Sequence, residues 1–280
     1  GLDVSSRDLG AYRRHFAETT VEAYVDRVFE VAGVREVVMT NDPFDDAERA
    51  VWLAERPRDP RFRVVVGTTE GETLLALNHR HPALADPRVR QALSHAIDRR
   101  AIIAGAMEGH GQPIGSHFAP GAAGFIDLAE RWPHDPARAR ALLAEADWGE
   151  GRLRLRLTLP PVAYARRSGE IIQAQLAAVG VRADIEAVEW APWLERVLAR
   201  KDFDLTIVAH TEPMDWDIYA RPDYYFGWRS PAYDALVARL SATPEGPRRL
   251  ALLGDAQRML ADAAVNVWHR CPSPSARCAP

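Results

Sequence analysis

Residues 151–188 read GRLRLRLTLPPVAYARRSGEIIQAQLAAVGVRADIEAV, and this stretch decides the fold class. Leucines occupy positions 153, 155, 157 and 159 with polar residues between them, a period of two that is typical of a strand with one buried face. Apolar residues then follow helical spacing up to Gly180, and residues 181–188 predict a second strand. Strand, helix and strand at this spacing indicate a βαβ unit with a right-handed crossover.

Helix-start signals lie on both sides of this unit. Asp86-Pro87, Asp135-Pro136 and Ser230-Pro231 each join an N-capping residue to a proline, which suits the first helical position. The helix that begins at Pro87 is expected to run as far as Gly105. Further strands are predicted at residues 63–67, 73–78, 203–209 and 265–268, the first two joined by a polar turn at 68–72. The chain is therefore predicted to be an α/β protein.

Composition excludes several classes of protein. The chain has 280 residues, of which 47% are hydrophobic, so it can bury a substantial core. A net charge of −4 offers no basic surface for nucleic acid. No apolar run approaches the roughly 20 residues that a membrane span needs. Length alone suggests one large or two modest domains.

Prolines at positions 57 and 60 mark the best candidate for a domain boundary. Before it, Val21 to Gly33 has the spacing and terminal glycine of a helix, followed by a strand at 36–39, a turn at 41–43 and a short helix through Trp52. We therefore expect an N-terminal segment at 1–60, a main domain at 61–268 and an irregular tail at 269–280.

The segment 210–228, HTEPMDWDIYARPDYYFGW, is the strongest candidate for a functional site. It directly follows a predicted strand, and ligands in open α/β sheets lie beyond the carboxyl ends of strands. Its carboxylates would pair with a cation, and its aromatic rings would form the walls of a pocket. The candidates are His210, Glu212, Asp215, Asp217, Tyr219, Tyr224, Tyr225 and Trp228. The alternatives are a structural loop held by buried aromatic rings and a metal site, although the diagnostic ligand spacing of a metal site is missing.

Three further residues are weaker candidates. His117 follows a glycine-rich turn and could line a cleft or simply be a solvated loop histidine. Tyr164 and Arg166 lie between a strand end and a helix start, where an arginine could grip a carboxylate. Neither a serine nucleophile motif nor a glycine-rich phosphate loop is present, so the sequence does not indicate a hydrolase or a nucleotide-binding protein.

Several segments together resemble the family-5 extracellular solute-binding proteins, the receptors of ABC importers for peptides, nickel and opines. The resemblance covers about residues 62–268. It is carried by Asn78 with HPALADPRVRQALSHAIDRRAIIAGAMEGHGQPIGSHFAPG (81–121), by HDPARARALLAEADW (134–148), by residues 160–181, by EWAPWLERVLARKDFDLTIVAHTEPMD (189–215) and by YARPDYYFGW (219–228).

This resemblance implies a periplasmic binding protein of type II, in which a ligand is enclosed between two lobes. It further implies a binding protein and not an enzyme, with no cofactor or metal, that captures a small peptide or other solute as a monomer and docks on ABC permease subunits at the periplasm or cell envelope. In the peptide receptors an aspartate just after the strand equivalent to 203–209 pairs with the peptide α-ammonium. Asp215 fits that position best, with Asp217 as the alternative.

Two departures from the family lead to further expectations. Family members are usually about twice as long, and the tail HRCPSPSARCAP (269–280) does not resemble the apolar strand that the family has there. Residues 28–52 weakly resemble a segment of uronate-isomerase-like amidohydrolases. We therefore expect an incomplete two-lobed architecture from a truncated or fused gene product. The competing hypotheses are a remnant that binds no ligand and an amidohydrolase-type enzyme fragment.

Overall fold

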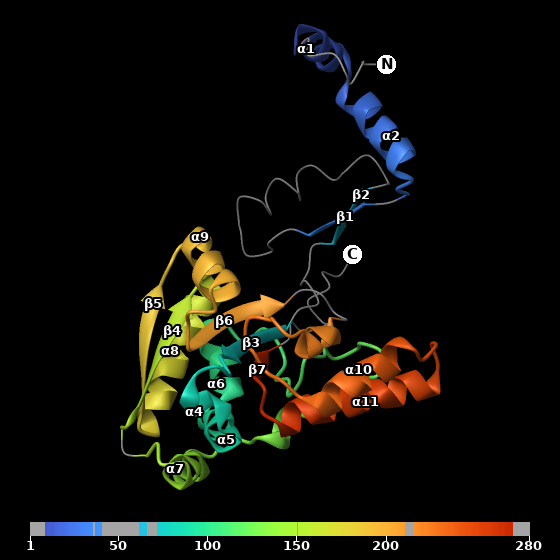
Figure 1. Cartoon of the computed structure of the whole chain (residues 1–280). Coiled ribbons are helices and arrows are strands. Elements are labelled where there is room, and N and C mark those ends of the chain that lie inside the picture. Colours follow the sequence, from blue (N-terminus) through green and yellow to red (C-terminus); the bar gives the residue numbers. More distant parts are fainter. Residues whose placement is uncertain are drawn as a thin grey trace. The chain divides into compact units, whose positions relative to one another are not determined.

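The computed structural model describes residues 9–35, 37–40, 62–65, 72–149, 151–210 and 215–270. The chain divides into two compact units, one of residues 1–67 with 277–280 and the other of residues 68–276 (Figure 1). The described elements are, in chain order, α1 (Leu9–Glu18), α2 (Val21–Ala32), β1 (Val37–Thr40), β2 (Phe62–Val65), β3 (Glu72–Leu77), α4 (Pro82–Ala85), α5 (Pro87–Ala96), α6 (Arg99–Ala106), η1 (Ala129–Arg131), α7 (Pro136–Glu145), β4 (Leu153–Leu159), α8 (Ala163–Ala178), β5 (Val181–Ala187), α9 (Trp190–Trp193), the π-helical η2 (Leu194–Ala199), β6 (Leu205–His210), η3 (Trp216–Ala220), α10 (Pro231–Ser241), α11 (Pro247–Asp262) and β7 (Val267–Arg270).

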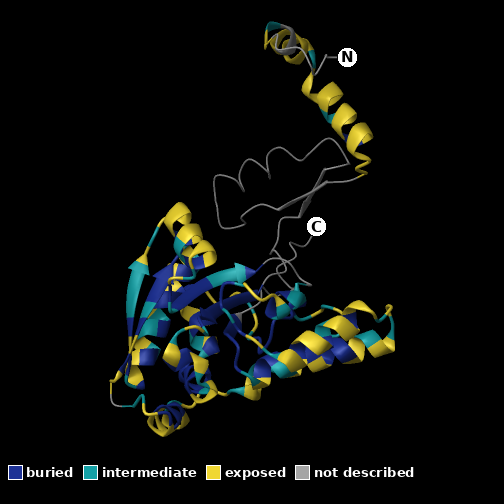
Figure 2. Ribbon diagram, in the orientation of Figure 1, coloured by how far each residue is buried: buried dark blue, intermediate teal, exposed yellow. Residues whose placement is uncertain are grey.

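The first unit contains two helices and a pair of short strands. The predicted helix ending at Gly33 is confirmed: Thr20 Oγ1 accepts the Ala23 N–H at 3.2 Å, and Gly33 ends the helix with a φ of 63°. Both helices are largely exposed (Figure 2), and Phe29 is the buried residue of α2. Strands β1 and β2 pair in parallel. The predicted turn at 41–43 and helix through Trp52 lie outside the described residues.

The second unit is built on a five-stranded mixed sheet with the order β5-β4-β6-β3-β7. Strand β4 is parallel to β5 and to β6, which confirms the predicted strand–helix–strand unit, whereas β3 is antiparallel to β6 and β7. The predicted strand at 73–78 begins one residue earlier, at Glu72. The two strands expected on either side of the 68–72 turn belong to separate sheets, β2 with β1 and β3 with β6 and β7.

Side chains alternate between the two faces of this sheet and feed two separate cores. Leu75 and Leu77 of β3 join the core that lies under α5 to α8, whereas Leu74 and Ala76 join the core under α10 and α11. Strand β3 is consequently buried along its whole length, as expected of an inner strand covered on both faces. The aromatic segment after β6 belongs to the second core.

The predicted helix starts are confirmed by their caps. Asp86 accepts the Arg88 N–H at 2.8 Å, and Asp135 and Ser230 cap α7 and α10 in the same way. The run predicted from Pro87 to Gly105 is not one helix, however. It breaks at Ile97, whose backbone is extended, and Asp98 caps a second helix, α6.

Two strand ends also differ from the sequence-based expectation. Strand β6 includes His210, and β7 runs to Arg270, two residues beyond the predicted end. Within the described part of the chain, no helix has both the length and the apolar character needed to cross a membrane.

Candidate functional site

The register of β3 and β6 brings an acidic residue beside a histidine at the edge of the second core. Glu72, the first residue of β3, is the cross-strand partner of His210, the last residue of β6. Partners in an antiparallel pair project from the same face of the sheet. Glu72 is 1% exposed and His210 is 7% exposed, so both polar side chains are enclosed.

His117 reaches the same place from the loop between α6 and η1. Its side chain is fully buried, and its Nε2 atom lies 2.8 Å from Glu72 Oε1 and in hydrogen-bond contact with Asp215 Oδ1. The loop packs tightly here, since a Cβ atom on Gly115 would lie 1.9 Å from the Leu128 carbonyl oxygen. A glycine at position 115 therefore allows the close approach that places His117.

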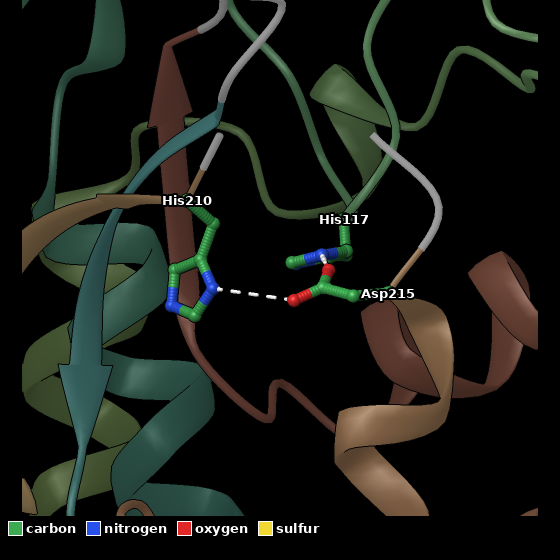
Figure 3. A group of neighbouring side chains, drawn as sticks. All are labelled: His117, His210 and Asp215. Carbon is green, nitrogen blue, oxygen red and sulfur yellow. Dashed lines mark hydrogen bonds and ion pairs between the residues drawn. The ribbon is translucent and has the colours of Figure 1, made fainter. Parts of the chain in front are cut away.

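Asp215 completes the group and is its accessible member. It immediately precedes η3, and its Oδ2 atom lies 3.8 Å from His210 Nδ1. Figure 3 shows its carboxylate between the two imidazole rings, one from β6 and one from the 107–128 loop. The Asp215 side chain is 17% exposed, whereas that of His117 is wholly enclosed. We call Glu72, His117, His210 and Asp215 the four-residue cluster.

Two buried tyrosines contact the ring nitrogens of His117 and His210 that face away from Asp215. The Tyr219 hydroxyl lies 2.9 Å from His117 Nδ1, and the Tyr225 hydroxyl lies 3.0 Å from His210 Nε2. Burial, followed by nearby negative charge, raises the pKa of both phenols well above the usual value, so both hydroxyls keep their protons. Each ring is thus oriented with its other nitrogen toward the Asp215 carboxylate.

The contacts within the cluster stabilise the charged forms of His117 and Asp215. Burial alone would lower the pKa of His117, but its hydrogen bonds to Asp215 and Glu72 outweigh that effect and raise the pKa to about 9. Burial likewise would raise the pKa of Asp215, yet the bonds from His117 and His210 hold it well below the usual range. The His117 imidazolium therefore faces the carboxyl groups of both Glu72 and Asp215.

The structure separates the remaining predicted site residues into two groups. Tyr224 is half-buried, with its ring centroid 6.4 Å from that of His210, and the Tyr164 hydroxyl accepts the Ala209 N–H at 3.1 Å, so both lie near the end of β6. Asp217, by contrast, pairs with Arg221 on η3, and Arg166 is exposed on α8.

Most of the aromatic candidates in residues 216–228 pack in the second core instead of forming the wall of a pocket. Tyr219, Tyr225 and Trp228 are all less than 9% exposed and pack in the second core. Among the four aromatic candidates of residues 210–228, Tyr224 is half-buried and the others are buried. Glu212 lies outside the described residues. Two shallow surface hollows, beside α8 and β5 and at the turn between α10 and α11, contain none of the cluster residues.

Sequence reasoning missed Glu72, which it assigned to a polar turn. An acidic residue ahead of the apolar run Thr73–Leu77 carries no local sign of burial, and the register with His210 is what makes Glu72 part of the site. His117, by contrast, was a candidate, and the structure shows it to be a buried and paired residue instead of a solvated one.

Comparisons of the sequence with a family model and with curated proteins agree on one family. Residues 36–254 match the model of bacterial extracellular solute-binding proteins, family 5, middle region. The dipeptide-binding protein of Escherichia coli K12 is 31% identical over 212 residues, covering 68% of this chain and 38% of that protein. A probable di/tripeptide-binding protein of Pseudomonas aeruginosa is 27% identical over 216 residues, covering 72% of this chain and 40% of that protein.

Solved structures support the same fold. The periplasmic binding protein DppA of Helicobacter pylori, in complex with the peptide STSA, superposes with a TM-score of 0.68 at 20% identity, covering 89% of this chain and 49% of that one. This likeness confirms the predicted type II periplasmic-binding-protein fold. The chain spans about two fifths of the length of the curated relatives it matches.

The comparison also corrects the interpretation of the N-terminal segment. The matched range includes residues 36–60, which were expected to lie outside the resemblance. An amidohydrolase-like origin for this segment is therefore not supported, and the corresponding enzyme hypothesis falls with it.

Proposed function

Because the chain belongs to the bacterial extracellular solute-binding proteins of family 5, we propose that it contributes to a receptor that captures small peptides for an ABC importer. The relatives reported above are named for binding dipeptides or di- and tripeptides, which favours a peptide over other solutes. The proposal extends to a monomeric receptor in the periplasm or cell envelope that delivers its ligand to membrane permease subunits.

The observation that carries the proposal is the Asp215 carboxylate, the member of the cluster with a solvent-accessible side chain. A buried carboxylate needs a charged partner, since leaving such a charge unpaired is costly. His117 contacts Asp215 from the enclosed side, and the Asp215 side chain stays 17% exposed, so a second cation can reach it. The α-ammonium of a peptide supplies a positive charge and three hydrogen-bond donors for this exposed side of Asp215.

The neighbours of Asp215 would prepare it for this role. His117 and His210 both contact the carboxylate, so its orientation is set before the ligand arrives. Preorganised groups bind more tightly because less ordering is required on association. The half-buried ring of Tyr224, close to His210, would line the approach to the cation.

Calorimetric titration with a dipeptide and its N-acetylated form tests this role. Acetylation removes the α-ammonium, so we expect the free dipeptide to bind and the acetylated form to bind at least about 100-fold more weakly, as for loss of one buried charged contact. Asp215→Asn should cause a similar loss. This variant keeps Glu72 beside the His117 imidazolium, which favours retention of the fold.

Asp217→Asn is the matched control, because Asp217 follows two residues later but pairs with Arg221 on the surface. It should bind the dipeptide as the unaltered chain does. Loss of binding in Asp217→Asn with normal binding in Asp215→Asn would transfer the role to Asp217. A melting temperature that no peptide mixture raises would instead favour the remnant that binds no ligand, since binding to the native state must stabilise it.

A further inference from the structure

Three side chains of the four-residue cluster form a row that leads from the interior to the surface. The Glu72 side chain is 1% exposed and that of His117 is fully buried, whereas that of Asp215 is 17% exposed. His117 Nε2 lies 2.8 Å from Glu72 Oε1 and also contacts Asp215 Oδ1. A ligand that reaches Asp215 is therefore separated from Glu72 by His117, so Glu72 can act on the ligand only through that histidine.

The Nε2 nitrogen of His117 has two acceptors for one hydrogen. The other ring nitrogen, Nδ1, lies 2.9 Å from the Tyr219 hydroxyl, which keeps its own proton. An imidazolium carries one hydrogen on each ring nitrogen, so the Nδ1 hydrogen is donated to Tyr219. Hydrogen bonds weaken steeply when they are far from straight, and the single Nε2 hydrogen can therefore bond well to Glu72 or to Asp215, but not to both at once.

We propose that Glu72 is a positioning residue of the peptide site, which accepts the hydrogen bond from His117 Nε2 when a ligand ammonium binds Asp215. This inference rests on the proposed capture of a peptide α-ammonium. The exchange frees the Asp215 carboxylate to accept hydrogen bonds from the ammonium, and it leaves the buried imidazolium paired. Without Glu72, the ligand and His117 would compete for the same carboxylate.

The charges around His117 agree with this exchange. In the described part of the chain, His117 is faced by Glu72 from β3, by His210 from β6, and by Asp215 and Tyr219 from the η3 segment. Burial lowers the pKa of His117, but the hydrogen bonds to Asp215 and Glu72, together with the charges of these two groups, raise it to about 9. Glu72 would continue to favour the protonated ring after a ligand has engaged Asp215.

Donor and acceptor are both held in place independently of Asp215. Glu72 is fixed by its register in β3, where it is the cross-strand partner of His210. The loop that carries His117 is tied to α11 by the buried Gln257, whose Oε1 accepts the Ile126 N–H at 2.9 Å. The exchange therefore requires a change in the direction of one hydrogen bond and no movement of the backbone, which keeps its cost on binding small.

The test compares the full chain with Glu72→Gln, which keeps the size of the side chain and a neutral acceptor but removes the carboxyl group. Titration calorimetry with a free dipeptide should show about 10- to 100-fold weaker binding by the variant, as for loss of a hydrogen bond between charged groups. Titration at pH 7 in buffers of different ionisation enthalpy then counts the protons released on binding. The variant should release more protons than the unaltered chain, because the ligand takes the last charged acceptor of His117.

Asp204→Asn is the matched control. Asp204 has a side chain that is 13% exposed, pairs with Arg156 at 3.3 Å and lies next to the opposite end of β6 from His210. Loss of this pair should lower the melting temperature but leave dipeptide affinity and proton release unchanged. A purely structural role of Glu72 would give the same pattern as the control.

A measurement on the unaltered chain tests the exchange without any variant. In nitrogen-15 spectra of histidine-labelled protein at pH 7, His117 should carry a hydrogen on both ring nitrogens with and without the dipeptide. Loss of the Nε2 hydrogen on binding would overturn the proposal, as would equal affinity and proton release in folded Glu72→Gln and the unaltered chain. These results leave peptide capture intact, whereas an unaltered chain that binds no dipeptide, or binds its acetylated form equally well, would overturn both proposals.

Discussion

Replacing Gly115 by alanine tests how the loop that carries His117 is held. A Cβ atom at position 115 would lie 1.9 Å from the Leu128 carbonyl oxygen, 2.2 Å from its carbon and 2.8 Å from the Ala129 nitrogen. All three are backbone atoms, so no side-chain rotation can relieve the overlap. Either the loop or the segment leading into η1 must move by at least about 1.5 Å before a normal contact distance is restored.

The free-energy cost of that movement to the folded state can be bounded. Overpacking a well-packed site costs about 1–3 kcal/mol. For a unit of about 200 residues this corresponds to a fall in melting temperature of roughly 2–12 °C. A shift of about 1.5 Å would also disturb the 2.8 Å contact between His117 and Glu72, so peptide affinity should fall together with stability.

Thermal unfolding followed by circular dichroism measures the effect, with Gly149→Ala as control. A Cβ atom at Gly149 would lie 3.3 Å from Ala144 Cα, a contact that small adjustments relieve. We expect the control to melt within about 3 °C of the unaltered chain. If Gly115→Ala melts like the control and keeps its ligand affinity, the tight packing at position 115 does not hold the His117 loop.

Two further predictions concern caps and buried histidines. Asp98→Ala should lower the free energy of unfolding in urea by about 1 kcal/mol, because Asp98 accepts the N–H groups of Arg100 and Ala101. Asp98→Asn should keep most of the stability. Equal losses in the two variants would contradict a capping role. Burial, followed by the charge of Arg90, lowers the pKa of His79 from 6.5 to about 3. The unfolded chain therefore binds a proton that the folded protein excludes, and stability should fall by up to about 1.4 kcal/mol per pH unit as the pH drops from 6.5 toward 3. His79→Asn should show a shallower fall in urea midpoint between pH 7 and 5, and an unchanged slope would refute this.

Local signals predicted much of the fold because the physics behind them is local. The helix starts at Asp86, Asp135 and Ser230 are correct because each cap and its proline act within one turn of the helix. The alternating leucines of residues 153–159 identified β4 for a similar reason, since the period of the side chains follows from the backbone. The break at Ile97 was missed because apolar residues continue on both sides of it.

Pairing between distant segments could not be predicted in this way. Strand β3 pairs with β6 and β7, which lie more than 120 positions further along the sequence, so local sequence patterns do not specify the pairing. The aromatic segment shows the same difficulty. Its rings suit the wall of a pocket or the interior of a core equally well, and packing against α10 and α11 placed most of them in the core.

By itself, the sequence determined the α/β class, the helix caps, the family and the candidacy of His117, His210 and Asp215. Tertiary structure alone decided that these residues meet and that Glu72 joins them. Glu72 and His210 become neighbours through the register of β3 and β6. His117 lies on a loop 93 residues before His210 in the sequence. The charge state of such a group depends on burial and on distances of a few ångströms, which exist only once the chain has folded.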